Sequence, residues 1–431
     1  MHQQHNFNFR NWAGNQSSVA KNYFAPASEE ELVNIIRQYQ KNRLVGTGHS
    51  WSSLCVTDAT LISTVNYNQV LHLDKDNLQV TIQSGVKLWQ LNAYLDQHGL
   101  ALKNLGSISE QSVVGAICTG THGSGKDYQI LGSQVVSFSI IKADGNKQVI
   151  HSENDQVLFN QALINLGALG IVSEMTLQVV PAFQLHEQIF IEDFETALQK
   201  LEEWRNTTDH LKFWWFPHTD KMIVYLHNRT QQPRNDSRFR QWLMEEVISV
   251  YAYRFFVWIG TLNRNWRKTI NRMLLANFIR PIDRIEKSYK VFNVPRPPIH
   301  REAEWAFDVA LAADVLRAYK QKIDNSSHRI NFLQEIRFSK ADNFALSPSF
   351  SRDTVWIGCY NIDNFGWVEL MHDFEEIGKH YNGRPHWGKE FTVSKTYLQG
   401  QYADWSKFVA LKSQFDPMGK FENKMIAELF S

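Results

Sequence analysis

The chain has 431 residues, 43% of them hydrophobic and 13% aromatic, which is enough apolar material for the cores of two domains and too much for a disordered protein. Its 45 Lys and Arg residues balance 44 Asp and Glu residues, so a net charge of +1 provides no overall attraction for nucleic acid. The three cysteines, Cys55, Cys118 and Cys359, are too few and too widely spaced for a disulfide framework or a structural zinc site.

The N-terminal part of the chain shows helix and strand patterns in alternation. Residues 1–12 contain no apolar core and no cleavage signature, so we expect a cytoplasmic protein rather than a secreted one. Ser28 and the glutamates after it form a capping-box pattern that begins a helix. Apolar periodicity and turn residues further predict strands at 43–46, 78–84 and 170–180, a helix at 87–98, and a hairpin of 135–141 with 148–150 around Asp144-Gly145.

The composition changes near Pro181, where Trp-rich and Phe-rich segments begin. Residues 230–240 form a polar, Arg-rich loop, and residues 247–262 form the most apolar stretch of the chain. That stretch contains Arg254 and is too short to span a bilayer comfortably, so we expect a buried or cap-domain helix. The alternative is a peripheral contact with a membrane surface, helped by the basic residues that follow, which are Arg264, Arg267 and Lys268.

Two glycine-rich segments are candidates for binding a phosphate-containing cofactor. Residues 45–53 read VGTGHSWSS, where glycines let the backbone approach a ligand closely; Trp51 breaks the dinucleotide pattern G-x-G-x-x-G. Residues 106–125 combine glycines with small hydroxyl residues and suit a pyrophosphate. Residues 120–127 resemble a P-loop, but Asp127 replaces the required Ser or Thr, which disfavours a nucleotide hydrolase. For residues 45–53, an ordinary strand-to-helix turn is the alternative.

Two segments of the second half carry candidate catalytic groups. In a strand, Glu335 and Arg337 would project from one face, where they could bind a polyol or polarise a lactone; the alternative is a surface ion pair. Residues 383–389 read GRPHWGK and place His386 and Lys389 in a turn bounded by glycine and proline. This turn is either part of a site or a rigid structural element.

Taken together and in this order, these motifs resemble a known family. Residues 45–52, 106–125 and 166–177 (LGALGIVSEMTL) are similar to the FAD-binding domain of the vanillyl-alcohol-oxidase superfamily. Six further segments resemble the sugar-1,4-lactone oxidase branch of this superfamily, and they read FRNWAGN, FWWFPHTD, EIRF, LSPSF, NGRPHWGK and FDPMGKFENKMIAELF. The resemblance covers nearly the whole chain, and bacterial alditol oxidases are close cousins of this branch.

The resemblance implies an α+β fold with two domains. We expect a PCMH-type FAD-binding domain at residues 10–182, an α/β cap domain at 183–404, and a C-terminal segment at 405–431 that returns to the FAD domain. The implied cofactor is FAD, bound covalently through His49, and no metal is expected. The cofactor-binding residues implied by the resemblance are Val45, Gly46, Thr47, Gly48, His49, Ser50, Gly106, Ser107, Ser112, Gly115, Thr119, Gly120, Thr121, His122, Gly123, Gly170, Ile171 and Val172.

The resemblance also implies the reaction. Glu335, Arg337, Lys389 and His386 are the expected catalytic residues for oxidation of the C2 hydroxyl of a sugar-1,4-lactone, giving an ascorbate-like product. Gly106 leaves space beside the flavin for O₂, which would become hydrogen peroxide; the plant dehydrogenase of this branch has alanine there. The alternatives are an alditol oxidase acting on open-chain polyols, a lactone dehydrogenase with another electron acceptor, and a flavin-binding protein without catalysis.

Overall fold

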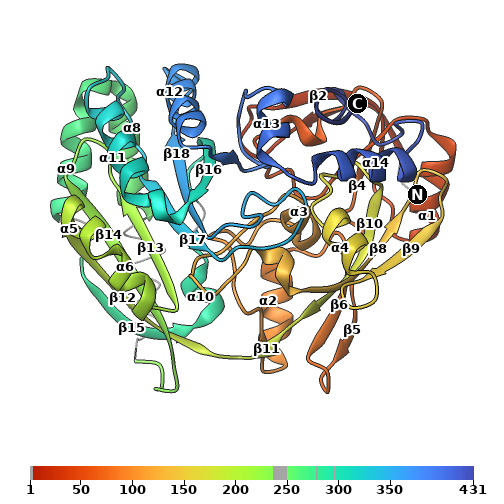
Figure 1. Cartoon of the computed structure of the whole chain (residues 1–431), viewed down its shortest axis with the longest axis horizontal. Helices are drawn as coiled ribbons and strands as arrows, with labels where there is room; N and C mark the ends of the chain where they lie inside the picture. The colour runs from red at the N-terminus through yellow and green to blue at the C-terminus, as the bar shows by residue number, and fades with distance from the viewer. Residues whose placement is uncertain (1–2, 236–249, 278–279, 295–296) are drawn as a thin grey trace.

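The computed structural model describes residues 3–235, 250–277, 280–294 and 297–431 and consists of two lobes (Figure 1). The N-terminal lobe contains a four-stranded and a five-stranded sheet built from the first 178 residues, and the second lobe contains one large sheet built from residues 184–385. Residues 236–249 lie outside the described residues. They include the last part of the polar loop expected at 230–240 and the first part of the apolar stretch expected at 247–262.

The first sheet of the N-terminal lobe supports the first glycine-rich segment. Its strand order is β1 (Gln3–Arg10), β2 (Ser17–Phe24), β4 (Thr60–Ser63) and β3 (Asn42–Val45). Helix α1 (Glu29–Gln38) begins after Ser28, whose hydroxyl accepts a hydrogen bond from the Glu31 N–H, and it buries the apolar face that the sequence predicts. The structure therefore confirms the predicted helix after Ser28 and the strand predicted at 43–46, which corresponds to β3.

The second sheet is antiparallel, with the order β5 (Val70–Asp74), β6 (Gln79–Gln83), β10 (Ile171–Gln178), β8 (Val135–Ile141) and β9 (Lys147–His151). The predicted hairpin is confirmed, with Gly145 at a φ of +81° in its turn. The strand predicted to reach residue 180 ends at Gln178, because β11 (Val180–Pro181) pairs instead with β7 (Leu100–Ala101). The lobe's helices are α1, α2 (Leu88–Gln97), α3 (Val113–Cys118) and α4 (Gln156–Ala162).

The second lobe is an eight-stranded antiparallel sheet covered by helices on its outer face (Figure 1). The strand order is β15 (Ile282–Lys287), β12 (Gln184–Asp193), β14 (Lys221–Thr230), β13 (His210–Trp215), β17 (Gln334–Ser339), β18 (Thr354–Asn361), β16 (Arg301–Asp308) and β19 (Arg384–Pro385). The helices that contact the strands or one another over the outer face are α5 (Phe194–Gln199), α6 (Leu201–Thr207), α11 (Ala312–Asp324) and α12 (Trp367–His380). The opposite face of the sheet faces the N-terminal lobe.

The C-terminal segment crosses back to the N-terminal lobe through α13 (Lys395–Gln401), α14 (Trp405–Phe415) and α15 (Lys424–Phe430). Lys420 donates to the carbonyl of Ile36 at 2.8 Å, and Arg43 donates to the carbonyl of Phe421 at 2.6 Å. The remaining helices of the second lobe are α8 (Val250–Leu262), α9 (Arg267–Asn277) and α10 (Ser288–Phe292). Within the described ranges, no helix has the length and apolar character needed to cross a bilayer.

Candidate active site

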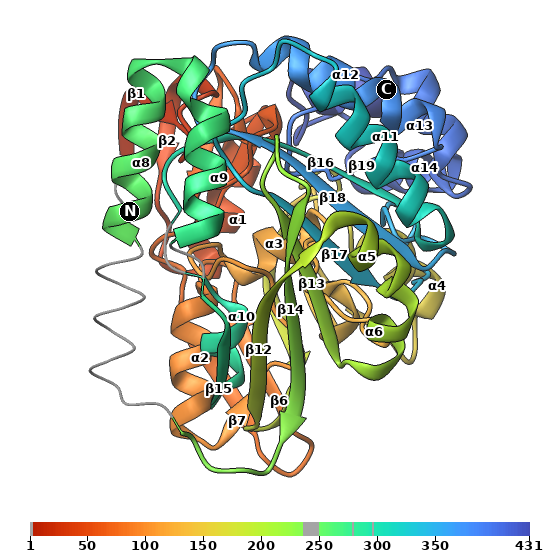
Figure 2. The same cartoon turned by 90° about the vertical axis from the view of Figure 1, so that its left-hand side faces the viewer.

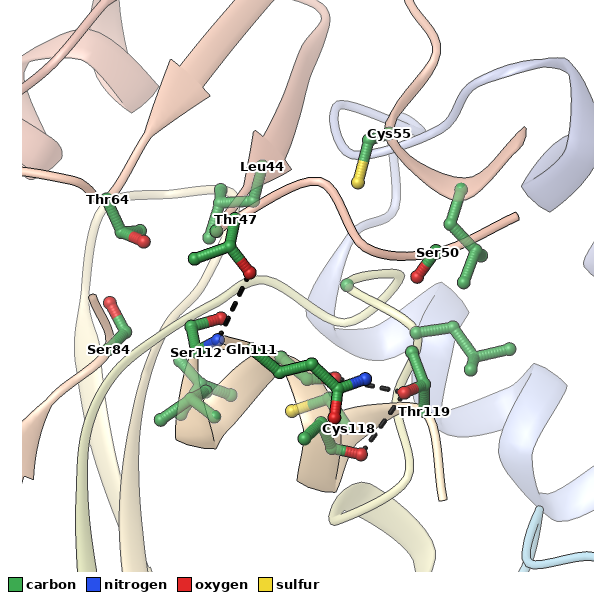
Figure 3. A pocket seen from close by; sticks show the side chains of 18 of the residues that line it. Leu44, Thr47, Ser50, Cys55, Thr64, Ser84, Gln111, Ser112, Cys118 and Thr119 are labelled. Carbon is green, nitrogen blue, oxygen red and sulfur yellow. Dashed lines mark hydrogen bonds between the residues drawn. The ribbon is translucent and has the colours of Figure 1, made fainter. Parts of the chain in front are cut away.

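A cleft with about 830 Å³ of empty volume opens in the N-terminal lobe, where β3, α3 and the start of β10 meet (Figure 3). Ten of the residues predicted to bind a cofactor line it, and they are Gly46, Thr47, Gly48, His49, Ser50, Ser112, Gly115, Thr119, Gly170 and Val172. Two glycine-rich segments that lie far apart in the sequence thus form one wall.

Two glycines of this wall pack closely against Ser112. A Cβ atom added at Gly46, directly after β3, or at Gly115 in α3 would collide with the Ser112 hydroxyl. The hydroxyl of Thr47 accepts a hydrogen bond from the Ser112 N–H at 3.3 Å, which joins the two segments (Figure 3). This wall therefore consists mainly of backbone with little side-chain bulk. It leaves room for a large cofactor that carries many hydrogen-bond acceptors.

Eight of the residues predicted to bind the cofactor do not line this cleft. Val45 and Ile171 are neighbours in sequence of lining residues, and both are buried. The other six, Gly106, Ser107, Gly120, Thr121, His122 and Gly123, belong to the segments that run to the large sheet. The P-loop-like segment is not an open loop, because Gly125 donates from its N–H to the carbonyl of Phe338 on β17 at 2.8 Å.

On the face of the large sheet opposite its helices, Glu335 and Arg337 lie side by side in β17, as the two-residue period predicts. Both are buried, and the Arg337 Nε lies 3.3 Å from a Glu335 carboxylate oxygen. The surface ion-pair alternative is therefore wrong. The Ser107 hydroxyl donates to Glu335 at 3.0 Å, which connects this pair to the glycine-rich segment beside Gly106.

Two more groups from β13 hold the Glu335 carboxylate. The Trp214 indole N–H donates to it at 3.1 Å, and the buried Lys212 ammonium lies 3.8 Å away. Burial alone would raise the pKa of Glu335, but the positive charges of Arg337 and Lys212 outweigh it and lower that pKa below its usual value. Glu335 is therefore an anion at neutral pH.

Arg337 also pairs with a second buried carboxylate, Glu304 on β16, at 3.3 Å. Glu304 in turn lies 3.2 Å from the His122 Nε2, and the His122 ring stacks on Trp356 at 3.7 Å between centroids. Burial and then the charge of Arg337 lower the pKa of His122. His122 thus belongs to the ionic cluster on the sheet.

The turn at residues 383–389 contributes an ion pair to the ionic cluster and is otherwise held by structural contacts. Lys389 forms an ion pair with Glu302 of β16, and its ammonium lies 4.2 Å from the centre of the Trp51 ring. His386 is buried, which lowers its pKa to about 3, and its Nδ1 accepts a hydrogen bond from the Gly388 N–H at 3.0 Å. Arg384 and Trp387 are structural, since Arg384 donates to backbone carbonyls and Trp387 is buried in an aromatic cluster.

Several members of these sites were not predicted from the sequence. In the ionic cluster these are Lys212, Trp214, Glu302 and Glu304. In the cleft they are Arg43, Leu44, Leu54, Cys55, Thr64, Ser84, Gln111, Val114, Ala116, Cys118, Asn165, Leu166 and Gly167. A signal existed for the two glutamates, because alternation in REAEWAFD places both on one face of a strand.

Comparison with known proteins agrees with this geometry. A sequence model of an FAD-binding domain matches residues 20–150, and the model described as D-arabinono-1,4-lactone oxidase matches residues 175–429. The chain belongs to the D-arabinono-1,4-lactone oxidase family. It is therefore an FAD-dependent oxidoreductase that acts on CH–OH groups. Among the described residues, no three His, Cys, Asp or Glu side chains meet as a metal site.

Relatives with similar sequences extend over the whole chain. An L-gulonolactone oxidase from Scyliorhinus torazame is 30% identical, with 98% of each chain covered. A D-arabinono-1,4-lactone oxidase from Candida glabrata is 35% identical, with 92% of this chain and 87% of the relative covered. An L-gulono-1,4-lactone dehydrogenase from Mycobacterium tuberculosis is 32% identical over 96% of each chain.

The fold is shared with a solved structure of cholesterol oxidase from B. sterolicum. The TM-score is 0.82 at 16% identity, with 100% of this chain and 97% of that chain covered. This likeness and the FAD-domain match confirm the predicted α+β fold, with a PCMH-type FAD-binding domain and a second domain over it.

The polar groups of the cleft fit FAD. The buried hydroxyls of Thr64 and Ser84 line it and have no hydrogen-bond partner within the described part of the chain. A buried hydroxyl without a hydrogen-bond partner lowers the stability of the protein. A polar ligand that forms hydrogen bonds with these two hydroxyls would remove that cost. His49 lies in the same wall, with its ring stacked on Trp12 at 5.4 Å between centroids.

Gly46→Ala is expected to lower the flavin content of the purified protein by about tenfold or more, because the added methyl group collides with Ser112 in the wall of the cleft. The ratio of flavin to protein absorbance measures this. Gly400→Ala is the matched control, since Gly400 has open space around its Cβ position. A wild-type ratio in Gly46→Ala would show that the glycine is not needed for cofactor binding.

Proposed function

We propose that the enzyme oxidises the C2 hydroxyl of a sugar-1,4-lactone to the 2-keto lactone, which tautomerises to an ascorbate-like enediol, and that O₂ is reduced to hydrogen peroxide. The observation that carries the proposal is the buried Glu335–Arg337 pair, which Ser107 joins to the segment that begins with Gly106. The names of the relatives support a lactone substrate.

The proposed cofactor-binding residues are the full set expected from the sequence, with Thr64 and Ser84 added by the structure. The chemistry that FAD supplies when bound is acceptance of a hydride from the carbinol carbon. The protein contributes position, charge and exclusion of water.

Arg337 is proposed to hold the substrate oxygen and to stabilise the negative charge that develops as the hydroxyl proton leaves. Its position is fixed by Glu335, by Glu304 and by a hydrogen bond of 3.1 Å to the carbonyl of His122. Glu335 is proposed to orient the substrate hydroxyl as a hydrogen-bond acceptor. Its lowered pKa makes it a weak base at neutral pH, so orientation is its main role.

Lys389 is proposed to add positive charge beside the reacting groups, paired with Glu302. His386 is proposed to act through this lysine rather than on the substrate. Its Nδ1 holds the Gly388 N–H, and its carbonyl accepts from the Lys389 N–H at 3.0 Å, so it fixes the turn that carries the ammonium group. A neutral imidazole serves this purpose, in agreement with its pKa of about 3.

The flavin is proposed to be attached covalently to His49. In support of this, His49 lies in the wall of the cleft beside Gly48, which adopts a φ of +67°. Acid precipitation is expected to leave the yellow colour with the protein pellet, and His49→Ala is expected to release it into the supernatant. Release of all colour from the wild-type protein would refute the attachment and leave the rest of the proposal intact.

Gly106→Ala is expected to slow reoxidation of the reduced flavin by O₂ while its reduction by substrate stays unchanged. A methyl group at this position lies 3.4 Å from the His122 carbonyl oxygen and from the Thr121 methyl group, so it fits without displacing the backbone. Stopped-flow absorbance measures both half-reactions. Equal reoxidation rates in the variant and the wild type would remove Gly106 from the oxygen reaction.

The substrate is tested by measuring peroxide release on D-arabinono-, L-gulono- and L-galactono-1,4-lactones beside xylitol and sorbitol. Peroxide from lactones alone supports the proposal, and peroxide from polyols alone assigns an alditol oxidase. The relative named as a dehydrogenase favours a second candidate, a lactone dehydrogenase with another electron acceptor. Flavin bleaching by lactones without peroxide would establish that candidate.

A further inference from the structure

The Lys212 ammonium group on β13 is buried beside the Glu335–Arg337 pair without a hydrogen bond to any residue that the structure describes. Lys212 is 6% exposed, and its Nζ lies 3.8 Å from a Glu335 carboxylate oxygen, which is beyond hydrogen-bond distance. An ammonium group carries three N–H donors, and burial without acceptors is costly. A ligand oxygen that accepts from Lys212 would therefore stabilise the site.

Strand pairing places Lys212 on the face of the large sheet that carries the proposed catalytic groups. β13 lies between β14 and β17 in that sheet (Figure 2). Lys212 is directly opposite Arg337 of β17 and Tyr225 of β14, so these three side chains project from the same face. On this face the Ser107 hydroxyl of the N-terminal lobe donates to Glu335 at 3.0 Å. Lys212 therefore lies next to the groups proposed to hold the reacting hydroxyl.

Two aromatic rings hold the ammonium group in this position. Its Nζ lies 4.8 Å from the centre of the Trp214 ring and 4.3 Å from the centre of the Tyr225 ring. At such distances a cation is attracted to the face of the ring. Trp214 is fixed in turn, because its indole N–H donates to Glu335 at 3.1 Å. The rings attract the charge but supply no oxygen acceptor, so the N–H donors of Lys212 can bond to a ligand.

The charges around Lys212 indicate that this ligand is neutral. Lys212 and Arg337 lie among the carboxylates of Glu335 and Glu304, so two cations already balance two anions. A carboxylate of the ligand would add a buried negative charge without a partner, which is costly. A hydroxyl group accepts a hydrogen bond from an ammonium group and adds no charge.

We propose that Lys212 binds the substrate directly, by donating a hydrogen bond to a hydroxyl group other than the one that is oxidised. The inference rests on the proposed function, in which Arg337 and Glu335 hold the reacting hydroxyl. A sugar-1,4-lactone carries further hydroxyls on its ring and side chain. A charged donor to one of them changes affinity by about tenfold or more. Lys212 therefore selects polyhydroxylated substrates over molecules that carry the reacting hydroxyl alone.

The test is anaerobic reduction of the bound flavin in Lys212→Met and in the wild type, at increasing concentrations of D-arabinono- and L-gulono-1,4-lactone. The concentration dependence gives the dissociation constant and the limiting rate separately. The dissociation constant is expected to rise by about tenfold or more. The limiting rate should change by less than about threefold, because Arg337 stays 3.3 Å from Glu335 and keeps it anionic.

α-Hydroxy-γ-butyrolactone separates a direct contact from an effect through Glu335. This compound has the reacting hydroxyl and the lactone carbonyl but no other hydroxyl. Its dissociation constant, from flavin reduction or from competition with a sugar lactone, should be equal in Lys212→Met and in the wild type. Lys212→Arg keeps a charged donor and should bind the sugar lactones more tightly than Lys212→Met does.

Lys412→Met is the matched control, because Lys412 is also buried but pairs with Glu422 on the C-terminal segment. Its dissociation constants should equal those of the wild type. Flavin content and circular dichroism show whether each variant is folded. If Lys212→Met does not retain flavin, Lys212→Gln takes its place, since a neutral amide donates a weaker hydrogen bond than an ammonium group.

Affinity of the sugar lactones within about twofold of the wild type in Lys212→Met would overturn the proposal. Equal weakening of α-hydroxy-γ-butyrolactone, or a fall in the limiting rate as large as the rise in the dissociation constant, would also overturn it, since Lys212 would then act through Glu335. If only xylitol or sorbitol reduces the wild-type flavin, the proposed lactone function fails. The same comparison of dissociation constant and limiting rate on that polyol then decides the role of Lys212.

Discussion

Arg337→Met is expected to slow reduction of the bound flavin by a lactone substrate by about a hundredfold or more. Arg337 is the cation shared by Glu335 and Glu304, so its loss removes the group proposed to stabilise the developing alkoxide and leaves two buried carboxylates underneutralised. The reduction rate is measured in single-turnover stopped flow without O₂, where oxygen chemistry does not contribute.

Loss of stability must be separated from loss of catalysis. Removing one partner of a buried ion pair costs about 3–5 kcal/mol, so thermal unfolding of Arg337→Met should occur at a lower temperature. Arg337→Lys keeps the charge and should restore most of the stability. It should remain well below the wild type in rate, because an ammonium group lacks the planar fork that contacts Glu335, Glu304 and the substrate together. A folded Arg337→Met that reduces its flavin at the wild-type rate would contradict the assigned role.

Local features of this protein were predictable because they depend on short-range periodicity. The helix after Ser28 and the hairpin at Gly145 each follow from a pattern of a few residues. The alternation of β17 also predicts that Glu335 and Arg337 share a face. Their burial was not predictable, because the same pattern fits a surface strand.

The partners of these residues depend on strand order, which no local pattern contains. Glu302 and Glu304 reach the site because β16 pairs with β18, and β18 pairs with β17. Lys212 reaches Glu335 because β13 pairs with β17 from the other side. Strands that are distant in the chain thus contribute one ionic cluster. The sequence indicates that Glu302 and Glu304 share a strand face, but not which strands lie beside that strand.

The glycine-rich segments show a similar division. Their composition indicates a ligand, and twelve of their residues line one cleft. Composition could not separate the part that lines the cleft from the part that reaches the large sheet. His122 illustrates this, because its contacts with Glu304 and Trp356 come from strands more than 180 residues later in the chain.

The stability of the folded protein is expected to fall steeply between about pH 6.5 and pH 4. His210, His218 and His386 are buried and have pKa values lowered to about 3 by burial. The unfolded chain binds protons at these histidines below their ordinary pKa, whereas the folded protein does not. Unfolding therefore takes up protons in this window, and the free energy of unfolding decreases as the pH is lowered.

One buried acid opposes this trend. Burial raises the pKa of Asp342 to about 7, so between its ordinary pKa and about 7 the folded state holds a proton that the unfolded state releases. Protonation of Asp342 therefore increases the free energy of unfolding as the pH falls, but the three histidines together decrease it by more. Each group contributes a slope of at most about 1.4 kcal/mol per pH unit, which leaves a net loss on acidification.

Thermal unfolding of the flavin-loaded enzyme measured at several pH values tests this balance. His210→Asn is the informative variant, because asparagine can keep the hydrogen bond from Nδ1 to the Ser124 carbonyl but cannot take up a proton. The melting temperature of this variant should depend less on pH than that of the wild type, whatever its absolute stability. If the two curves are parallel from neutral pH to about pH 4, His210 is protonated in the folded protein and the buried neutral imidazole does not exist.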